Sequence, residues 1–269
     1  MSTVGSHWRC LYFKMLVSKL LKRTLSFKRL SESTQYGWRH SCADFIHVEV
    51  DKIDREFCID QRCELLDVGY SEGYVRTRLG YLGSMWERGL EMNLVKWNPW
   101  RGMLKGLKKG QKKYPHKSFE HFEKFHEDPL FMAVQLHGFR ISEIANITPD
   151  DFVMDAPVPY INIEHNHIRK CKNDYTQRQV PIHPKFERFI DKFNFSENPN
   201  AGDYFSRKLK KHTGISAHGL RHMFITRMRR AQVEYSIAMA IVGHKPIGMT
   251  ASYGDVLIED MADQIKNVE

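Results

Sequence analysis
The sequence predicts a mainly α-helical protein with a small β-sheet, made of an all-helical first domain and a mixed α+β second domain. Apolar residues recur at helical spacing through most of residues 1–100, whereas residues 160–183 alternate apolar and polar residues as strands do. A stretch rich in glycine and lysine separates the two patterns. A chain of 269 residues is long enough to bury a core in each of two such domains.

The first domain, residues 1–100, is predicted to be a set of helices. "SEST" at 31–34 offers N-cap hydroxyls, and Pro99 disfavours helical backbone at the residue before it, so the domain ends at "WNPW". Apolar residues at helical spacing mark four segments: 11–22, 33–47, 54–67 and 72–92.

Residues 101–117, "RGMLKGLKKGQKKYPHK", are predicted to be a basic interdomain linker because they lack a long periodic apolar face. They hold seven Lys or Arg and no acid, and residues 1–30 hold another seven with no acid. The net charge of +9 and pI near 9.2 favour a polyanionic partner, whose phosphates these stretches would follow. A solvated terminus and a solvated linker are the simpler alternative.

Residues 118–269 are predicted to form the second domain. It begins with helical segments at 118–125 and 129–147, and Asn173 with Asp174 supplies turn chemistry between two short strands at 160–168 and 178–183. Further helices are expected around residues 184–194, 202–212, 218–231, 234–242 and 255–266.

Cysteine usage and hydropathy predict a cytoplasmic protein. The five cysteines are odd in number and form no C-x-x-C pair, which is typical of reduced thiols inside a cell. No apolar run approaches the roughly 18 residues of a membrane span, so no membrane partner is expected. The basic N-terminus could also be a mitochondrial transit peptide, but the helical spacing of Leu11, Val17 and Leu21 favours a folded helix.

The second domain contains side chains with the chemistry that breaking a phosphodiester requires. Attack on phosphorus builds charge on the non-bridging oxygens, and two guanidiniums can each donate two parallel hydrogen bonds to it. A tyrosine hydroxyl can act as nucleophile, and a lysine with a lowered pKa can protonate the leaving sugar oxygen. The candidate residues are Arg140, Lys172, His218, Arg221, His244 and Tyr253.

Each candidate alone has a structural explanation. Arg140 could simply pair with Glu143 one turn later, and Tyr253 could be a half-buried surface residue. His218 and His222 could hold zinc, but a third ligand at a recognisable spacing is missing, so His222 is expected to be structural. The whole set of candidates still favours a catalytic site. Without one, several residue types and several sequence spacings would have to match by independent coincidence.

Three segments of the second domain resemble the signature boxes of the tyrosine recombinases, the family of phage integrases and Xer-type enzymes. They are "HGFRISEIANITPDDF", "HGLRH" and "VGHKPIGMTASYGD". Their spacing agrees as well: His244 follows Arg221 by 23 residues, and Tyr253 follows His244 by nine. One departure is His137, which stands where the family usually has threonine.

The resemblance implies a role for each residue of the phosphate site. Arg140 and Arg221 would hold the scissile phosphate, His244 would donate a hydrogen bond to it, and His218 would assist as acid or base.

The resemblance also implies the covalent step. Tyr253 would form a 3′-phosphotyrosyl bond while Lys172, on a β-hairpin, protonates the 5′-hydroxyl leaving group. Lys170 is the alternative hairpin lysine. No metal and no nucleotide cofactor would be needed.

The first domain resembles the family's helical core-binding (SAM-like) domain, so the two domains are expected to close around double-stranded DNA. The implied function is site-specific recombination for integration, excision or resolution of a mobile element. The alternatives are a type IB topoisomerase and a non-catalytic DNA-binding relative. Backbone contacts are expected from the basic linker, at Arg101, Lys105, Lys108, Lys109, Lys112 and Lys113.

The C-terminal segment after Tyr253, "DVLIEDMADQIKNVE", has Leu257, Met261 and Ile265 on one helical face. Packing on its own domain is the simplest interpretation. In the family such a tail often docks on a neighbouring protomer, so the resemblance implies a tetramer or dimer assembled on DNA through the tail.

Overall fold

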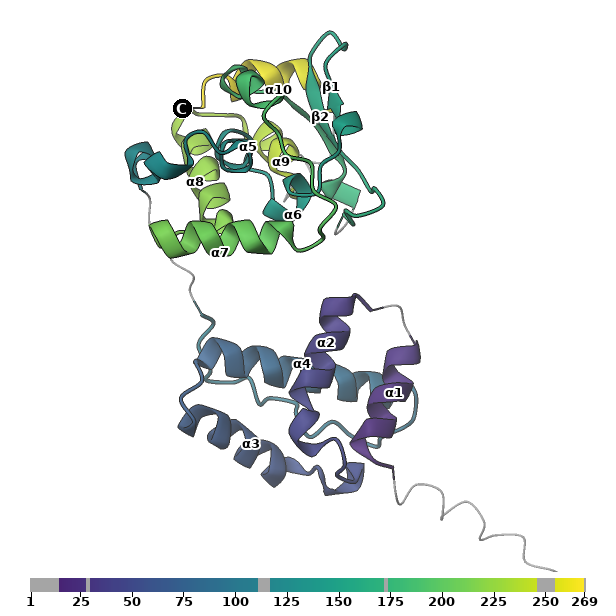
Figure 1. Ribbon diagram of the computed structural model, residues 1–269. Helices are drawn as coiled ribbons and strands as arrows, with labels where there is room; N and C mark the ends of the chain where they lie inside the picture. Colours follow the sequence, from purple (N-terminus) through teal and green to yellow (C-terminus); the bar gives the residue numbers. More distant parts are fainter. Residues whose placement is uncertain (1–14, 28–29, 111–116, 172–173, 246–254, 269) are drawn as a thin grey trace, which may run out of the picture. The chain divides into compact units, whose positions relative to one another are not determined.

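The computed structural model describes residues 15–27, 30–110, 117–171, 174–245 and 255–268. It divides the chain into two compact units, Met1–Lys112 and Lys113–Glu269 (Figure 1). Most of the described residues are helical, and the described strands form one three-stranded sheet in the second unit. The predicted fold class, mainly α with a small β-sheet, is confirmed. No described helix is long and apolar enough to cross a membrane.

Side-chain caps start three of the helices described in the first unit. The side chains of Ser31, Asp54 and Ser71 each accept a hydrogen bond from the backbone N–H three residues later. The helices and short 3-10 turns are α1 (Val17–Phe27), α2 (Glu32–Ser41), η1 (Ala43–Phe45), η2 (Val50–Lys52), α3 (Arg55–Asp67) and α4 (Glu72–Glu91).

Two helix boundaries of the first unit differ from the prediction. Helix α2 ends at Ser41 instead of residue 47, because the chain tightens there into the 3-10 turn η1. Helix α1 continues to Phe27, beyond the expected end at residue 22, and residues 11–14 of the expected segment lie outside the described residues.

Residues 101–110 pack on the first unit, which corrects the prediction that the linker begins at residue 101. Met103 and Leu107 are buried in the core of the first unit. Their spacing of four residues is helical, but the glycines around them hide this pattern in the sequence. Arginines of α3 and α4 bind the carbonyl groups of this stretch: Arg62 donates to Met103 O (3.1 Å) and Arg76 to Leu107 O (3.3 Å).

The sheet of the second unit is antiparallel, in the order β1-β2-β3. Ile161 pairs with Val180 across β2 and β3, and both side chains are fully buried. The strands are β1 (Phe152–Val153), β2 (Tyr160–Ile163) and β3 (Arg178–Pro181).

Strand β2 ends at Ile163, five residues earlier than predicted. The Asn166 side chain accepts hydrogen bonds from the backbone N–H groups of Ile168 (2.9 Å) and Arg169 (2.5 Å). Such an Asx turn competes with strand pairing and redirects the chain. Strand β1 was not predicted, since two residues are too short for a pattern of alternation.

The helical segment expected at 129–147 is two helices, because Gly138 breaks it. Gly138 has a left-handed backbone (φ 67°), and a Cβ there would stand 2.3 Å from the Phe224 ring. The helical elements of the second unit are η3 (Phe119–Phe125), α5 (Pro129–His137), α6 (Ile141–Ile144), η4 (Pro149–Asp151), η5 (Asp174–Thr176), η6 (Pro184–Phe189), α7 (Ala201–Thr213), α8 (Ala217–Arg230), α9 (Tyr235–Val242) and α10 (Ile258–Ile265).

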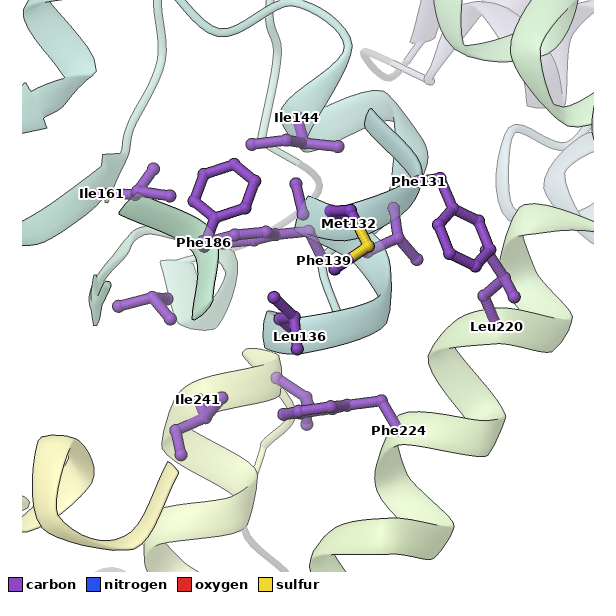
Figure 2. Close-up of a cluster of buried hydrophobic side chains, with 14 of the residues drawn as sticks. Phe131, Met132, Leu136, Phe139, Ile144, Ile161, Phe186, Leu220, Phe224 and Ile241 are labelled. Atoms are coloured by element: carbon purple, nitrogen blue, oxygen red, sulfur yellow. The ribbon is translucent and has the colours of Figure 1, made fainter. Parts of the chain in front are cut away.

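Helices α5, α8 and α9 meet in the core of the second unit. Figure 2 shows Leu136 of α5 facing Ile241 of α9, with Phe224 of α8 beside them. The same cluster continues through Phe139 and Phe186, both fully buried. Because these helices end or begin next to the predicted phosphate-binding residues, this core fixes where those residues stand.

Helix α10 packs on its own unit. Met261, Ile265 and Val268 are buried in the core of the second unit, and the helix contacts β3 and α9. The apolar face predicted for this segment is thus covered within the same chain, except that Leu257 is 57% exposed.

Candidate active site
Arg140 stands at the start of α6, where the chain leaves Gly138. Its backbone N–H donates to Glu143 Oε2 (2.9 Å), its Nη1 to Glu143 Oε1 (2.5 Å) and its Nη2 to Gly243 O (3.2 Å). The Arg140 side chain is 26% exposed, so part of the guanidinium still faces solvent. An arginine fixed by its own helix cap and by a distant loop is ready to bind an anion without rearrangement.

Arg221 is almost completely buried on α8. Its guanidinium donates to Gly138 O (2.7 Å), Val242 O (2.5 Å) and His244 Nε2 (2.9 Å). Burial lowers the pKa of Arg221 to about 9, which leaves the guanidinium charged at neutral pH. Its hydrogen bonds therefore connect the ends of α5 and α9 to α8.

His244 follows α9, after Gly243 turns the chain through a left-handed backbone (φ 62°). Burial, followed by the charges of Arg221, Arg140 and Arg178, lowers the pKa of His244 to about 4. The ring is therefore neutral at pH 7. Because its Nε2 accepts a hydrogen bond from Arg221, its proton is on Nδ1, which can donate to an anion.

Two residues outside the predicted candidate set, Glu143 and Arg178, complete the cluster. Arg178 on β3 donates from Nη2 to Glu143 Oε2 (3.0 Å) and from Nε to Ile241 O (2.7 Å). Arg221 Nη1 lies 4.0 Å from the same carboxylate oxygen. Burial alone would raise the pKa of Glu143, but the charges and hydrogen bonds of Arg178 and Arg140 outweigh it and lower the pKa.

Three guanidiniums thus surround one carboxylate, which leaves an excess of two positive charges. The sequence indicated Glu143 only as a possible pairing partner of Arg140, three residues before it. Arg178 gave no such signal, because only strand pairing brings it to this place. The chemistry of the cluster is suited to a phosphodiester whose negative charge increases during reaction.

His218 lies one helical turn before Arg221, near the start of α8, and its side chain is exposed. Its Nε2 is 3.2 Å from Nε2 of His222, and the two rings meet edge to face. Burial and the charges of Arg221 and Arg229 lower the pKa of His222. His222 is thus a hydrogen-bonding neighbour of a predicted acid–base residue.

Lys172 and Tyr253 lie outside the described residues, as do Lys112 and Lys113 of the linker. The structure brings Arg140, Arg221 and His244 together.

His137, the departure from the family pattern, is fully buried at the end of α5. Its Nδ1 donates to Ala133 O (3.2 Å), and its Nε2 accepts from the backbone N–H of His183 (2.9 Å). Burial, followed by the charge of His183, lowers the pKa of His137 to about 3. A neutral histidine thus ties the end of α5 to the backbone that follows β3.

The predicted DNA-contacting cations of the linker differ in their surroundings. Lys105, Lys108 and Lys109 are exposed, whereas Arg101 donates to both carboxylate oxygens of Glu87 (2.7 and 2.9 Å). The charge of Arg101 is already paired, so this residue is less suited to phosphate binding than the sequence indicated.

Comparison with known proteins gives one family match and several similar structures. Residues 189–259 match the model of the phage integrase family, and this range includes Arg221 and His244. No curated protein matches the chain significantly.

The fold resembles those of two integrases over nearly the whole chain. The Tn1549 transposon integrase in complex with circular intermediate DNA is 16% identical, with a TM-score of 0.64 and coverage of 93% of this chain and 98% of that one. A lambda integrase dimer bound to a core site is 13% identical, with a TM-score of 0.65 and coverage of 94% and 95%. A lambda integrase tetramer bound to a Holliday junction has a TM-score of 0.63 at 13% identity, covering 90% and 78%. Residues 189–259 are thus similar to the phage integrase family, and the fold of the chain is similar to that of solved integrases.

Proposed function
We propose that the protein is a site-specific tyrosine recombinase that cleaves and rejoins duplex DNA through a 3′-phosphotyrosine intermediate. The observation that carries this proposal is the convergence of Arg140, Arg221 and His244 beside the Glu143 carboxylate. These groups come from three elements far apart in the sequence and leave hydrogen-bond donors for one anion.

Each candidate residue has a role in the proposed cleavage step. The Tyr253 hydroxyl attacks phosphorus and passes its proton to His218, while the guanidiniums and His244 Nδ1–H stabilise the charge on the phosphate oxygens. The bond to the 5′ oxygen breaks, and Lys172 protonates that oxygen. The phosphotyrosyl bond conserves the phosphodiester's energy, so a 5′-hydroxyl of another strand can reverse the step.

Duplex DNA is the proposed partner. The similar Tn1549 and lambda integrase structures contain DNA, and the lambda proteins form a dimer and a tetramer on it. We extend DNA binding and assembly to this chain, acting in the cytoplasm on the nucleoid or on a host's DNA. We further propose that α10, packed here on its own unit, docks on a neighbouring protomer in that assembly. Truncation after Gly254 should then abolish cooperative assembly on DNA.

The proposal is tested with nicked suicide duplexes drawn from the DNA that flanks the encoding gene. The protein should form a covalent adduct with a subset of these duplexes, and Tyr253→Phe should form none while still binding them in a mobility-shift assay. Relaxation of supercoiled plasmids without any preferred site would instead indicate a topoisomerase. Binding without an adduct by the unaltered protein would indicate a non-catalytic relative.

A further inference from the structure
Arg169 is a buried arginine that the proposed mechanism does not use. Only 1% of its side chain is exposed, and it lies within the connection between β2 and β3. Its Nη2 and Nη1 donate to the two carboxylate oxygens of Asp151 (2.8 and 3.1 Å), a forked ion pair that is also buried. Burying two charges is costly, so a pair kept this far inside calls for an explanation beyond stability.

The remaining hydrogen bonds of Arg169 join two parts of the second unit. Its Nε donates to Glu164 O (2.8 Å), within the β2–β3 connection. Its Nη1 also donates to Glu143 O (3.3 Å), on the helix of the arginine cluster. Arg169 therefore ties the first half of the connection to α6 by side-chain contacts.

Other contacts fix the same stretch of backbone. Asn166 accepts from the N–H of Arg169, and its own side-chain amide donates to Asn146 O (3.1 Å). Asp151 is held in turn, because it accepts from the backbone N–H (2.8 Å) and the hydroxyl (3.0 Å) of Thr148. The path of the chain is thus determined up to Arg169, three residues before Lys172 in the sequence.

We propose that Arg169, held by Asp151, is a positioning residue for the general acid of the β2–β3 connection. The inference rests on the proposed function, in which a lysine of this connection protonates the 5′ oxygen. General acid catalysis depends on the donor lying within hydrogen-bond reach of the leaving atom. Loosening this half of the connection should therefore slow the departure of the 5′ oxygen and leave phosphate binding by the cluster intact.

A substrate that needs no general acid separates this role from a purely structural one. In a duplex with sulfur in place of the bridging 5′ oxygen, the bond from phosphorus to sulfur breaks and the electron pair leaves as a thiolate. A thiol is far more acidic than an alcohol, so this leaving group needs no proton. A defect that acts through the lysine disappears on such a substrate, whereas a defect in the arginine cluster remains.

The variant to test is the double change Arg169→Gln with Asp151→Asn, which leaves neither buried charge alone. Single-turnover cleavage of the oxygen duplex identified above should slow by roughly 100-fold, the range expected for loss of a general acid. Cleavage of the sulfur duplex should proceed near the wild-type rate. Arg169→Lys, which keeps the charge but not the fork, should give an intermediate defect on the oxygen duplex alone.

Arg188→Gln is the matched control, because that arginine is 66% exposed and pairs with Glu127 on the surface. It should cleave both duplexes like the wild type. If the double variant and Arg169→Lys are folded by circular dichroism but equally slow on both duplexes, or not slow on either, the inference is overturned. If the wild-type protein cleaves neither duplex, the proposed function fails with it, so the two failures are distinguishable.

Discussion
At the scale of single residues, the Glu143 carboxylate organises the site. It is 4% exposed and lies within 4.0 Å of guanidinium nitrogens from Arg140, Arg178 and Arg221. The negative charge of the carboxylate offsets the repulsion among the three guanidiniums. Its hydrogen bonds also orient N–H groups of Arg140 and Arg178 before any substrate binds. Such preorganised charge acts on a transition state without a cost of reorganisation during reaction.

Glu143→Gln should therefore lower both activity and stability. The amide cannot compensate the buried guanidiniums, so unfolding in urea should become easier by about 3–5 kcal/mol, as when one partner of a buried pair is removed. Cleavage should slow by about 100-fold as the arginines lose their orientation. Glu91→Gln, at a 57% exposed surface pair, is the control and should change neither. Equal stability of the two variants would contradict this role of Glu143.

The buried histidine His137 predicts acid instability of the second unit. It takes a proton near pH 6.5 in the unfolded chain but only near pH 3 in the folded protein. Between these values the unfolded state binds the extra proton, so each unit of acidification favours unfolding by about 1.4 kcal/mol. His137→Gln, whose amide can donate and accept, should show a shallower loss of stability between pH 6 and pH 4 in chemical denaturation. An unchanged slope would contradict the burial argument.

At the scale of elements, the C-terminal helix α10 belongs to the core of its own unit in the isolated chain. Ile265 is 1% exposed and Met261 6%, so the helix is held by apolar burial against β3 and α9. To dock on a neighbouring protomer, the helix would have to leave this core and bury a similar apolar area against the neighbour.

Ile265→Ala should reveal that burial as a loss of stability. Truncating a buried isoleucine typically costs about 2–5 kcal/mol, so the melting temperature should fall by several degrees in a thermal scan. Leu257→Ala, at a 57% exposed position of the same segment, should melt like the wild type. A fall of equal size in both variants would mean that the helix is not packed as described.

Most element types and many of their ends were predictable from the sequence, while some ends were not. Apolar spacing indicated α3, α4, α7, α8 and α9 within two residues at either end. The errors fell where side chains or a single glycine override periodicity: Gly138 divides α5 from α6, and Asn166 shortens β2. The same limit applies to the site. Arg140, Arg221 and His244 were found because they lie in segments that resemble the signature boxes of a family, whereas Arg178 reaches Glu143 only through strand pairing.

At the scale of the whole molecule, the chain carries an excess of positive charge that would attract the phosphates of a DNA duplex. The net charge is +9, and three exposed lysines, at 105, 108 and 109, lie in the last stretch of the first unit. Cations that replace counterions on phosphates make affinity fall steeply with salt, whichever sequence is bound.

Replacing Lys105, Lys108 and Lys109 by glutamine should reduce the slope of log affinity against log salt by about 2.7, since each phosphate contact contributes about 0.9. Fluorescence anisotropy with a labelled duplex at several salt concentrations measures this slope. Arg101→Gln is the matched control and should leave the slope near that of the wild type, because Glu87 already pairs that charge. A larger change from Arg101 than from the lysines would reverse the assignment.

Gly138 has neither a charge nor a side chain, yet its carbonyl oxygen accepts a hydrogen bond from Arg221. Because it lacks a Cβ, the ring of Phe224 can pack directly against its backbone. An alanine would hold an unfavourable left-handed backbone and press on that ring, and the simplest relief would shift the carbonyl. Engineers who randomise the protein to redirect it to new DNA sequences should therefore leave this position unvaried.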